Sequence, residues 1–355
     1  MQRGAHSRMD LRHFPICLVD IASSFVSNPN SPLSTLTHRP VGIELMMVDD
    51  HVTLTSGRVN LDTDGPATWQ GNGHTIVYSP YKYELIGPEK LWDDKKVHLF
   101  FAANWHCSIY LAIGYVILIN VLQKFMENRK PYSMRKILFL WNAFLAVFSM
   151  IGTWRCGIEF VHMMTTRPFV NSLCHSVDPH GPAALWSCLF ALSKIAEFGD
   201  TFFLILRKRP VIFLHWYHHA VVLILTWHSA VELTAAGRYF ILMNYFVHSI
   251  MYTYYMITSV GYRLPKIVSM TVTFLQTAQM LIGVCISVAV LGLKLNGRVC
   301  QQSYENIAIA FAIYASFLLL FSSFFIKAYL TKKPKRTEAS SSDSMPISGD
   351  KNKED

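Results

Sequence analysis

The sequence predicts an all-α integral membrane protein with seven transmembrane helices. Three features indicate this fold class: few charged residues, long apolar runs, and basic residues gathered in every second loop between those runs. The 355 residues are 52% hydrophobic and 15% charged, whereas an average soluble domain carries about 25% charged residues. The mean hydropathy is +0.27. This composition excludes an ordinary soluble domain and an intrinsically disordered chain.

Seven apolar segments are long enough to cross a bilayer, which requires about 20 helical residues. They span residues 105–123, 137–154, 184–206, 211–229, 239–259, 267–291 and 306–328. We therefore expect a single seven-helix domain at residues 79–330. Residues 1–78 show no repeat and no clear hydrophobic period, so we interpret them as a disordered extension or an artefact of gene prediction. The Ser-rich and charged residues 331–355 predict a disordered tail.

Lysines and arginines set the expected orientation, because cytosolic loops of membrane proteins carry an excess of them. One set of loops, together with the segment after the last span, holds Lys124, Arg129, Lys130, Arg135, Lys136, Arg207, Lys208, Arg209, Arg263, Lys266, Lys327, Lys332, Lys333, Lys335 and Arg336. This set is predicted to be cytosolic, and with it the C-terminus. Lys351 and Lys353 near that end resemble a dilysine signal, which predicts the endoplasmic reticulum membrane. The basic residues form separate clusters, so a nucleic-acid partner is not expected.

Two of the seven cysteines fall in loops on the other side of the membrane. Cys174 and Cys300 could pair in an oxidising lumen. The alternative is two free thiols whose backbones lie too far apart to be bridged. The absence of CxxC pairs and of Cys/His finger spacing argues against a zinc module.

Ionisable side chains inside a membrane segment are costly and therefore indicate a functional site. Span 211–229 contains the sequence HWYHH, in which His215, His218 and His219 lie at positions i, i+3 and i+4. These positions share one face of a helix. Three imidazoles on one face are difficult to explain by packing alone, whereas the isolated His162 and His228 are interpreted as ordinary interfacial residues.

Three other spans carry polar stripes. In span 184–206, Lys194, Glu197 and Asp200 follow one another at i+3 steps, and an alternative interpretation is an ion-paired helix face that holds the bundle together. Span 239–259 and span 267–291 supply the remaining stripes, which are formed by Asn244, His248, Tyr252, Tyr255, Thr273, Gln276 and Gln279. The two glutamines could equally be interhelical hydrogen bonds. The simplest interpretation of all four stripes is a shared interior cavity.

Histidine in such a cavity can act as a general acid or base, a nucleophile or a metal ligand. A di-iron membrane oxygenase needs several histidine boxes, and this sequence contains one. A single metal held by His215, His218 or His219 with His248 remains an alternative, as in a metal-dependent lipid oxygenase or hydroxylase. A seven-helix receptor or transporter is a third possibility.

Four motifs occur in order on successive spans: KIAEFGDT at 194–201, HWYHH at 215–219, NYFVHSIMYTYY at 244–255 and TFLQTAQ at 273–279. Together they resemble the very-long-chain fatty acid elongases of the endoplasmic reticulum, over roughly residues 80–335. The segment 206–219, LRKRPVIFLHWYHH, most resembles the branch acting on saturated and monounsaturated chains.

The resemblance implies a barrel of six helices around an acyl tunnel, with the seventh helix outside it. It implies a 3-oxoacyl-CoA synthase that condenses a long-chain acyl-CoA with malonyl-CoA, releases CoA and carbon dioxide, and requires no metal or other cofactor. His218 corresponds to the nucleophile that carries the acyl group, and His248 to the second histidine of the reaction centre. The other matching site residues are His215, His219, Asp200 and Asn244, and the family disulfide corresponds to Cys174 and Cys300. Expected partners are membrane lipids, other elongation enzymes and a second copy of the chain.

Overall fold

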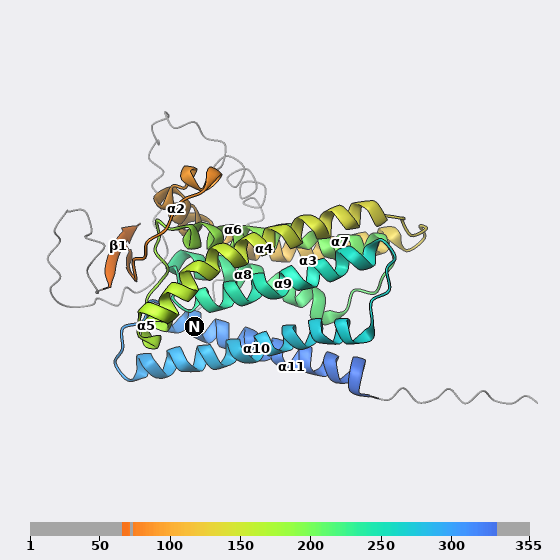
Figure 1. Cartoon of the computed structure of the whole chain (residues 1–355). Helices are drawn as coiled ribbons and strands as arrows, with labels where there is room; N and C mark the ends of the chain where they lie inside the picture. Colours follow the sequence, from red (N-terminus) through yellow and green to blue (C-terminus); the bar gives the residue numbers. More distant parts are fainter. Residues whose placement is uncertain (1–65, 72–73, 332–355) are drawn as a thin grey trace, which may run out of the picture.

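The computed structural model describes residues 66–71 and 74–331, which form helices and one two-stranded sheet (Figure 1). The predicted extension up to residue 65 and the dilysine-like ending lie outside the described residues. The strands are β1 (Ala67–Gly71) and β2 (His74–Tyr78). The helices are η2 (Gly87–Leu91), α2 (Asp94–Asn104), α3 (Cys107–Met126), α4 (Arg135–Thr166), α5 (Phe169–Cys174), α6 (Pro182–Ala196), α7 (Phe198–Leu206), α8 (Phe213–Glu232), α9 (Gly237–Ser259), α10 (Lys266–Leu295), α11 (Tyr304–Phe325) and η3 (Ile326–Leu330).

The long helices close a ring around an interior space. Helix α4 packs against α9, α9 against α10, α10 against α11, α11 against α8, α8 against α6, and α6 against α4. Helix α3 packs against α7 and α8. Figure 1 shows α10 and α11 running side by side along one edge of the bundle. This order is compatible with the six-helix barrel that the family resemblance implies.

Four helices in the described part are long and apolar enough to cross a membrane: α3, α4, α10 and α11 with its extension η3. They correspond to four of the seven predicted spans. The other three spans correspond to α6 with α7, which are 15 and 9 residues long and so are each too short to cross alone, and to α8 and α9, which carry polar side chains. The chain is therefore a multi-pass helical membrane protein, and the count of seven spans stays a prediction.

Helix α4 extends beyond the second predicted span, from residue 154 to Thr166. Arg155 and Glu159 interrupt the apolar run, but both charges are buried and paired. Arg155 donates to Glu89 over 2.6 Å, and Glu159 accepts from Arg238 over 2.7 Å. A buried charge is tolerated when it is paired and hydrogen-bonded, so these residues do not end the helix.

The third predicted span, residues 184–206, is two helices. Helix α6 ends at Ala196, and α7 begins at Phe198. Glu197 lies between them, with its backbone N–H donating to the carbonyl oxygen of Ser193. Lys194 and Glu197 lie three residues apart, and their buried side chains pair over 2.7 Å.

A β-hairpin and two loops close one end of the bundle. Strands β1 and β2 pair in an antiparallel register that places Ala67 opposite Tyr78. The buried side chains of Trp69 and Ile76 belong to a small hydrophobic core of the hairpin. The backbone N–H of Ser176 donates to the carbonyl oxygen of Val77 over 2.8 Å. The structure therefore also describes residues that precede the predicted domain boundary at residue 79.

Cys174 and Cys300 form a disulfide at the same end, as the family resemblance implies. The backbone continues this link, because Gln301 N–H donates to the Cys174 carbonyl and Ala235 N–H donates to the Gln301 carbonyl, both over 2.8 Å. We call this the disulfide end of the bundle. The opposite end, where residues 207–209 connect α7 to α8, is the arginine end.

Candidate active site

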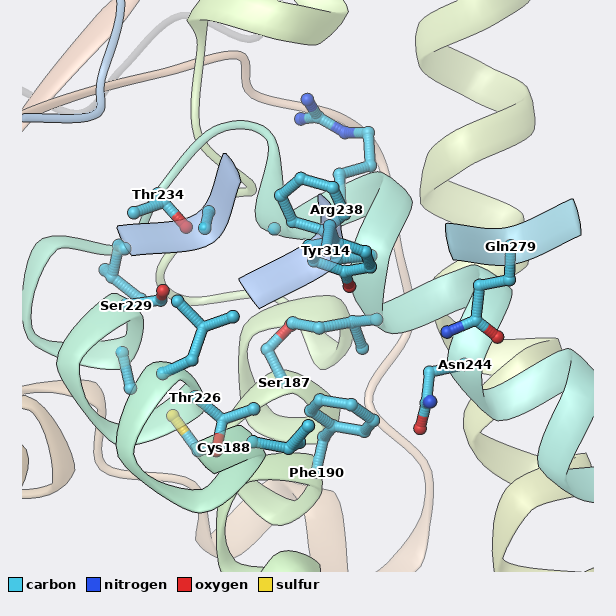
Figure 2. Close-up of a pocket in the computed structure, with 18 of the residues that line it drawn as sticks. Ser187, Cys188, Phe190, Thr226, Ser229, Thr234, Arg238, Asn244, Gln279 and Tyr314 are labelled. Atoms are coloured by element: carbon cyan, nitrogen blue, oxygen red, sulfur yellow. The ribbon is translucent and has the colours of Figure 1, made fainter. Parts of the chain in front are cut away.

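Two adjoining chambers lie within the helix ring. The outer chamber, toward the arginine end, has a volume of about 430 Å³ and is lined by residues of α4 and α7 to α11. The inner chamber, toward the disulfide end, has a volume of about 80 Å³. His218, Asn244, Gln279 and Met280 line both chambers. Figure 2 shows Asn244 and Gln279 together at one side of the inner chamber. These four residues therefore mark the boundary between the chambers.

Helix α8 brings the three box histidines together, as the i, i+3 and i+4 spacing predicts. The ring centroids of His215 and His219 lie 4.6 Å apart, and those of His218 and His219 lie 5.7 Å apart. All three side chains line the outer chamber. They are not equivalent, however, because their partners differ.

His215 is held by a chain of hydroxyl groups. Its Nε2 lies 2.9 Å from Oγ1 of Thr201 on α7. The same oxygen lies 2.6 Å from the hydroxyl of Tyr115 on α3. One nitrogen of His215 is thus engaged by the wall of the bundle, which fixes the orientation of this ring.

His218 is packed but keeps a free nitrogen. Its ring lies against Phe317 of α11, with the centroids 4.7 Å apart. Its Nδ1 is buried and has no hydrogen-bond partner among the residues that the structure describes. A buried polar atom without a partner is unfavourable, so its retention at the boundary of two chambers indicates a group that meets a ligand.

His248 of α9 faces the outer chamber opposite the box. Its Nδ1 lies 3.8 Å from Oε1 of Glu197. That oxygen also accepts a hydrogen bond from Lys194 Nζ over 2.7 Å, and Lys194 donates to Oδ1 of Asn244 over 3.1 Å. Lys194 and Glu197 are therefore a buried ion pair behind the wall, in contact with two residues that line it. This geometry fits both interpretations of Lys194 and Glu197: an ion pair that holds the bundle together, and a pair that orients residues of the site.

Asp200 is fixed by two donors. Its Oδ1 accepts from Trp141 Nε1 and its Oδ2 accepts from the hydroxyl of Tyr252, each over 2.7 Å. These bonds join α4, α7 and α9 at the outer chamber. Its neighbour Gly199 is needed for this packing, since a Cβ there would lie 2.7 Å from the Trp141 ring.

The structure brings most of the predicted site residues into one cavity. The outer chamber is lined by His215, His218, His219, Asp200, Asn244, His248, Tyr252, Tyr255, Gln276 and Gln279. Gln279 also faces the inner chamber, while Gln276 donates to the sulfur of Met251 over 3.1 Å. In the part of the chain with described coordinates, no three His, Cys, Asp or Glu side chains are grouped to hold a metal ion. This arrangement does not favour the single-metal alternative.

Several residues of the site could not be found by sequence reasoning. Tyr115 and Phe317 stand in apolar spans without any polar pattern around them. Thr201 belongs to the KIAEFGDT motif, but its spacing gave no sign that it contacts His215. Trp141 is likewise an isolated aromatic residue. Their roles follow from packing between helices that are distant in sequence.

Arginines gather at the mouth of the outer chamber. Arg207 lines the chamber, and the pKa of its guanidinium is lowered by partial burial and by the neighbouring charges of Arg209 and Arg135. Three like charges this close repel one another. An anionic group at the chamber mouth would relieve that repulsion.

The fold and the site define a multi-pass helical membrane protein with a histidine-lined interior cavity that narrows toward one end. The family model "ELO: GNS1/SUR4 family" matches residues 100–337. The chain belongs to this family, and its predicted membership of the fatty acid elongases is confirmed.

Relatives support this assignment over most of their length. The chain is 51% identical to "Putative fatty acid elongase 4" of Caenorhabditis elegans over 274 residues, which cover 77% of this chain and 94% of that protein. It is 43% identical to "Very long chain fatty acid elongase 6" of Drosophila melanogaster over 231 residues, covering 64% and 73% of the two chains. It is 36% identical to the human protein of the same description over 264 residues, covering 74% and 98%.

Proposed function

We propose that this protein is the condensing enzyme of fatty acid elongation, a very-long-chain 3-oxoacyl-CoA synthase. It joins a long-chain acyl-CoA to malonyl-CoA and releases 3-oxoacyl-CoA, CoA and carbon dioxide. The observation that carries this proposal is the position of His218. Its buried Nδ1 has no hydrogen-bond partner among the described residues, and its side chain lines both chambers. Family membership and the elongase relatives support the same reaction class.

The two chambers suit the two parts of the substrate. The inner chamber is lined mainly by apolar side chains, which favours the acyl tail, because burial of apolar surface stabilises it by about 25 cal/mol per Å². The larger outer chamber has a more polar wall and the arginine mouth. It suits the thioester and malonyl groups, and the guanidinium groups would attract CoA phosphates.

The reaction is assigned in two steps. The His218 imidazole attacks the thioester carbonyl carbon, a C–N bond forms, the C–S bond breaks, and CoA leaves as a thiolate. Malonyl-CoA then loses carbon dioxide, and the electron pair of the broken C–C bond attacks the acyl carbonyl carbon. The C–N bond breaks and returns the imidazole. We assign His248 to proton transfer at this centre, while His215, His219, Asp200 and Asn244 orient the reacting groups.

Mass spectrometry tests the covalent step. The purified protein is incubated with palmitoyl-CoA in the absence of malonyl-CoA, and the peptide that contains His218 is expected to gain the mass of one acyl group. His218→Ala should abolish the adduct, while His162→Ala, at an isolated histidine outside both chambers, should retain it. An unmodified peptide under conditions in which the complete reaction turns over would eliminate the acyl-enzyme.

The metal-dependent oxygenase remains distinguishable by experiment. It requires stoichiometric iron or zinc in the purified protein and loss of activity with chelators. The condensing enzyme instead requires malonyl-CoA and releases one carbon dioxide for each chain extended. Expression in elongase-deficient cells, followed by total fatty-acid profiling, tests the reaction in a membrane.

We also propose residence in the endoplasmic reticulum membrane with a cytosolic C-terminus. Its support is membership of the elongase family and the distribution of Lys and Arg among the loops. Glycosylation acceptor sites placed after residue 331 should remain unmodified, whereas sites placed in the 296–302 loop should be glycosylated. The reverse pattern would overturn the orientation.

A further inference from the structure

The inner chamber is narrow for the number of side chains around it. Its wall contains 22 residues and the outer wall contains 24, yet the volumes are about 80 and 430 Å³. The chamber extends along α8 from His218 to Ser229, and 11 residues of helix correspond to about 16 Å. A long cavity of small volume accepts a slim ligand and excludes a wide one.

Tyr314 of α11 is one of the largest side chains in this wall. It lies one helical turn from Phe317, which contacts His218. In the view of Figure 2, Tyr314 lies between Asn244 and Gln279 on one side and Ser229 and Thr234 on the other. Its ring therefore borders the path that leads from the reaction centre toward the disulfide end.

Two other helices fix the position of this ring. Phe240 of α9 stacks on Tyr314, with the ring centroids 4.7 Å apart and an interplanar angle of 25°. On α10, Gly283 leaves a notch for the ring, because a Cβ at residue 283 would lie 2.3 Å from Cδ1 of Tyr314. Non-bonded carbon atoms optimally lie about 3.5–4.0 Å apart. A methyl group at residue 283 would consequently push the ring out of the notch.

We propose that Tyr314, seated on Gly283, sets the bore of the inner chamber and selects straight acyl chains over methyl-branched or repeatedly kinked ones. This inference rests on the proposed function, since it takes the inner chamber as the site of the acyl tail. A straight tail passes the tyrosine ring without displacing it. A methyl branch or a series of cis double bonds needs width where Tyr314, Phe240 and α10 leave little.

Purified variants test the selection through kcat/KM for three substrates: palmitoyl-CoA, an anteiso-methyl-branched acyl-CoA and linoleoyl-CoA. Tyr314→Ala widens the chamber and is expected to raise the ratio of branched or kinked to straight substrate about tenfold, within the 10- to 200-fold range of small-group discrimination in apolar pockets. Tyr314→Phe keeps the ring and should keep the wild-type ratio. Phe311→Ala, at an outward-facing aromatic residue of the same helix that is 43% exposed, is the matched control.

Gly283→Ala should narrow the inner chamber, whereas Tyr314→Ala widens it. The displaced ring should lower kcat/KM for palmitoyl-CoA at least tenfold. The double variant Gly283→Ala/Tyr314→Ala removes the clash and should recover palmitoyl-CoA turnover, because contacting residues are non-additive in a mutant cycle. If Tyr314→Ala does not fold, Tyr314→Leu with the same cycle replaces it.

The outcomes separate this inference from the proposed function. An unchanged substrate ratio in a folded, active Tyr314→Ala or Tyr314→Leu protein would overturn the role of Tyr314 in selection. It would not contradict the proposed condensation reaction. Additive effects of Gly283→Ala and Tyr314→Ala on kcat/KM in the double variant would also overturn the role of Tyr314 in selection. A wild-type protein that extends none of the three substrates with malonyl-CoA would overturn the proposed function and the selector with it.

Discussion

Oγ1 of Thr201 lies 2.9 Å from Nε2 of His215. Since the same oxygen lies 2.6 Å from the Tyr115 hydroxyl, the first histidine of the box is tied to α3 through α7. His218 has no such tie at Nδ1 among the described residues. In the described part of the chain, the HWYHH motif thus contains one imidazole held by a hydrogen bond to Thr201 and one whose Nδ1 has no hydrogen-bond partner.

Tyr115→Phe tests the role of the tie. The substitution removes the hydroxyl but keeps the ring, which stacks on Phe198 with centroids 3.9 Å apart. We expect kcat to fall about tenfold, which corresponds to about 1.4 kcal/mol, while KM for the acyl-CoA changes little. Steady-state kinetics with palmitoyl-CoA and malonyl-CoA measures both constants.

Tyr110→Phe on the same helix is the matched control and should retain wild-type kcat. A fall in thermal stability of Tyr115→Phe without a change of kcat would show that the tie serves the fold alone. A rise in KM at constant kcat would also contradict a positioning role, since it indicates loss of uniform substrate binding.

The apolar runs predicted the long helices because about 20 apolar residues have few alternatives to a membrane-length helix. The runs could not predict where α4 ends, since Arg155 and Glu159 look like a boundary until their partners Glu89 and Arg238 are known. Those partners lie 66 and 79 residues away in sequence. The β-hairpin was also missed, because its short strands lie within a segment without a clear pattern.

Helical spacing placed the three histidines of α8 on one face, since positions i, i+3 and i+4 adjoin in any α-helix. Which imidazole is free depends instead on contacts from other helices, such as Thr201 of α7 and Phe317 of α11. The same limit applies to Lys194 and Glu197. Their i+3 spacing predicted the pair, but the contacts with Asn244 and His248 required the packed structure.

Lys194→Met should destabilise the protein strongly. Lys194 and Glu197 are 3% exposed each, and removal of one partner of a buried pair costs about 3–5 kcal/mol because the remaining charge is unpaired. The melting temperature in detergent should fall by roughly 6 °C or more. The double variant Lys194→Met/Glu197→Leu should recover much of that loss, as measured by intrinsic fluorescence on heating.

Lys96→Met is the control for this pair. Lys96 contacts Asp93 over 2.9 Å at an exposed position, and exposed ion pairs contribute little. Its melting temperature should match wild type. A stable Lys194→Met protein that lacks activity would show that the pair acts on the site more than on the fold.

Loss of the disulfide should loosen the end of the bundle that bears the β-hairpin. The bond joins cysteines 126 residues apart in sequence, and removal of a native disulfide typically costs about 2–5 kcal/mol. Cys174→Ser, Cys300→Ser and the double variant should therefore show equal reductions in melting temperature. Cys285→Ser, at an exposed free cysteine, is the control. A reductant should lower the wild-type melting temperature by more than that of the double variant.

Stability should decrease as the pH rises from 5 to 8, because two groups near the disulfide end favour their protonated forms in the folded protein. Burial raises the pKa of Asp178 from 3.8 to about 6 and outweighs the opposing effects of the His180 hydrogen bond and charge, while the charges of Glu159 and Asp94 add smaller increases. The pKa of His180 is raised above 6.5, chiefly by its hydrogen bond to Asp94.

The sign follows from linkage, since a group whose pKa is higher in the folded state loses its stabilising contribution as the pH rises through that value. Burial alone would raise the pKa of Asp94, but the bond from His180 and other contacts leave it lowered, so its contribution persists until the pH falls below its usual range near 3.8. In Asp178→Asn, the fall in melting temperature between pH 5 and pH 8 should be smaller than in wild type by at least 2–4 °C, which corresponds to about 1 kcal/mol. Glu305→Gln, at an exposed residue of α11, should preserve the wild-type slope. A wild-type melting temperature that rises between pH 5 and pH 8 would contradict the assignment, because it would require groups that favour the deprotonated folded state to dominate this end.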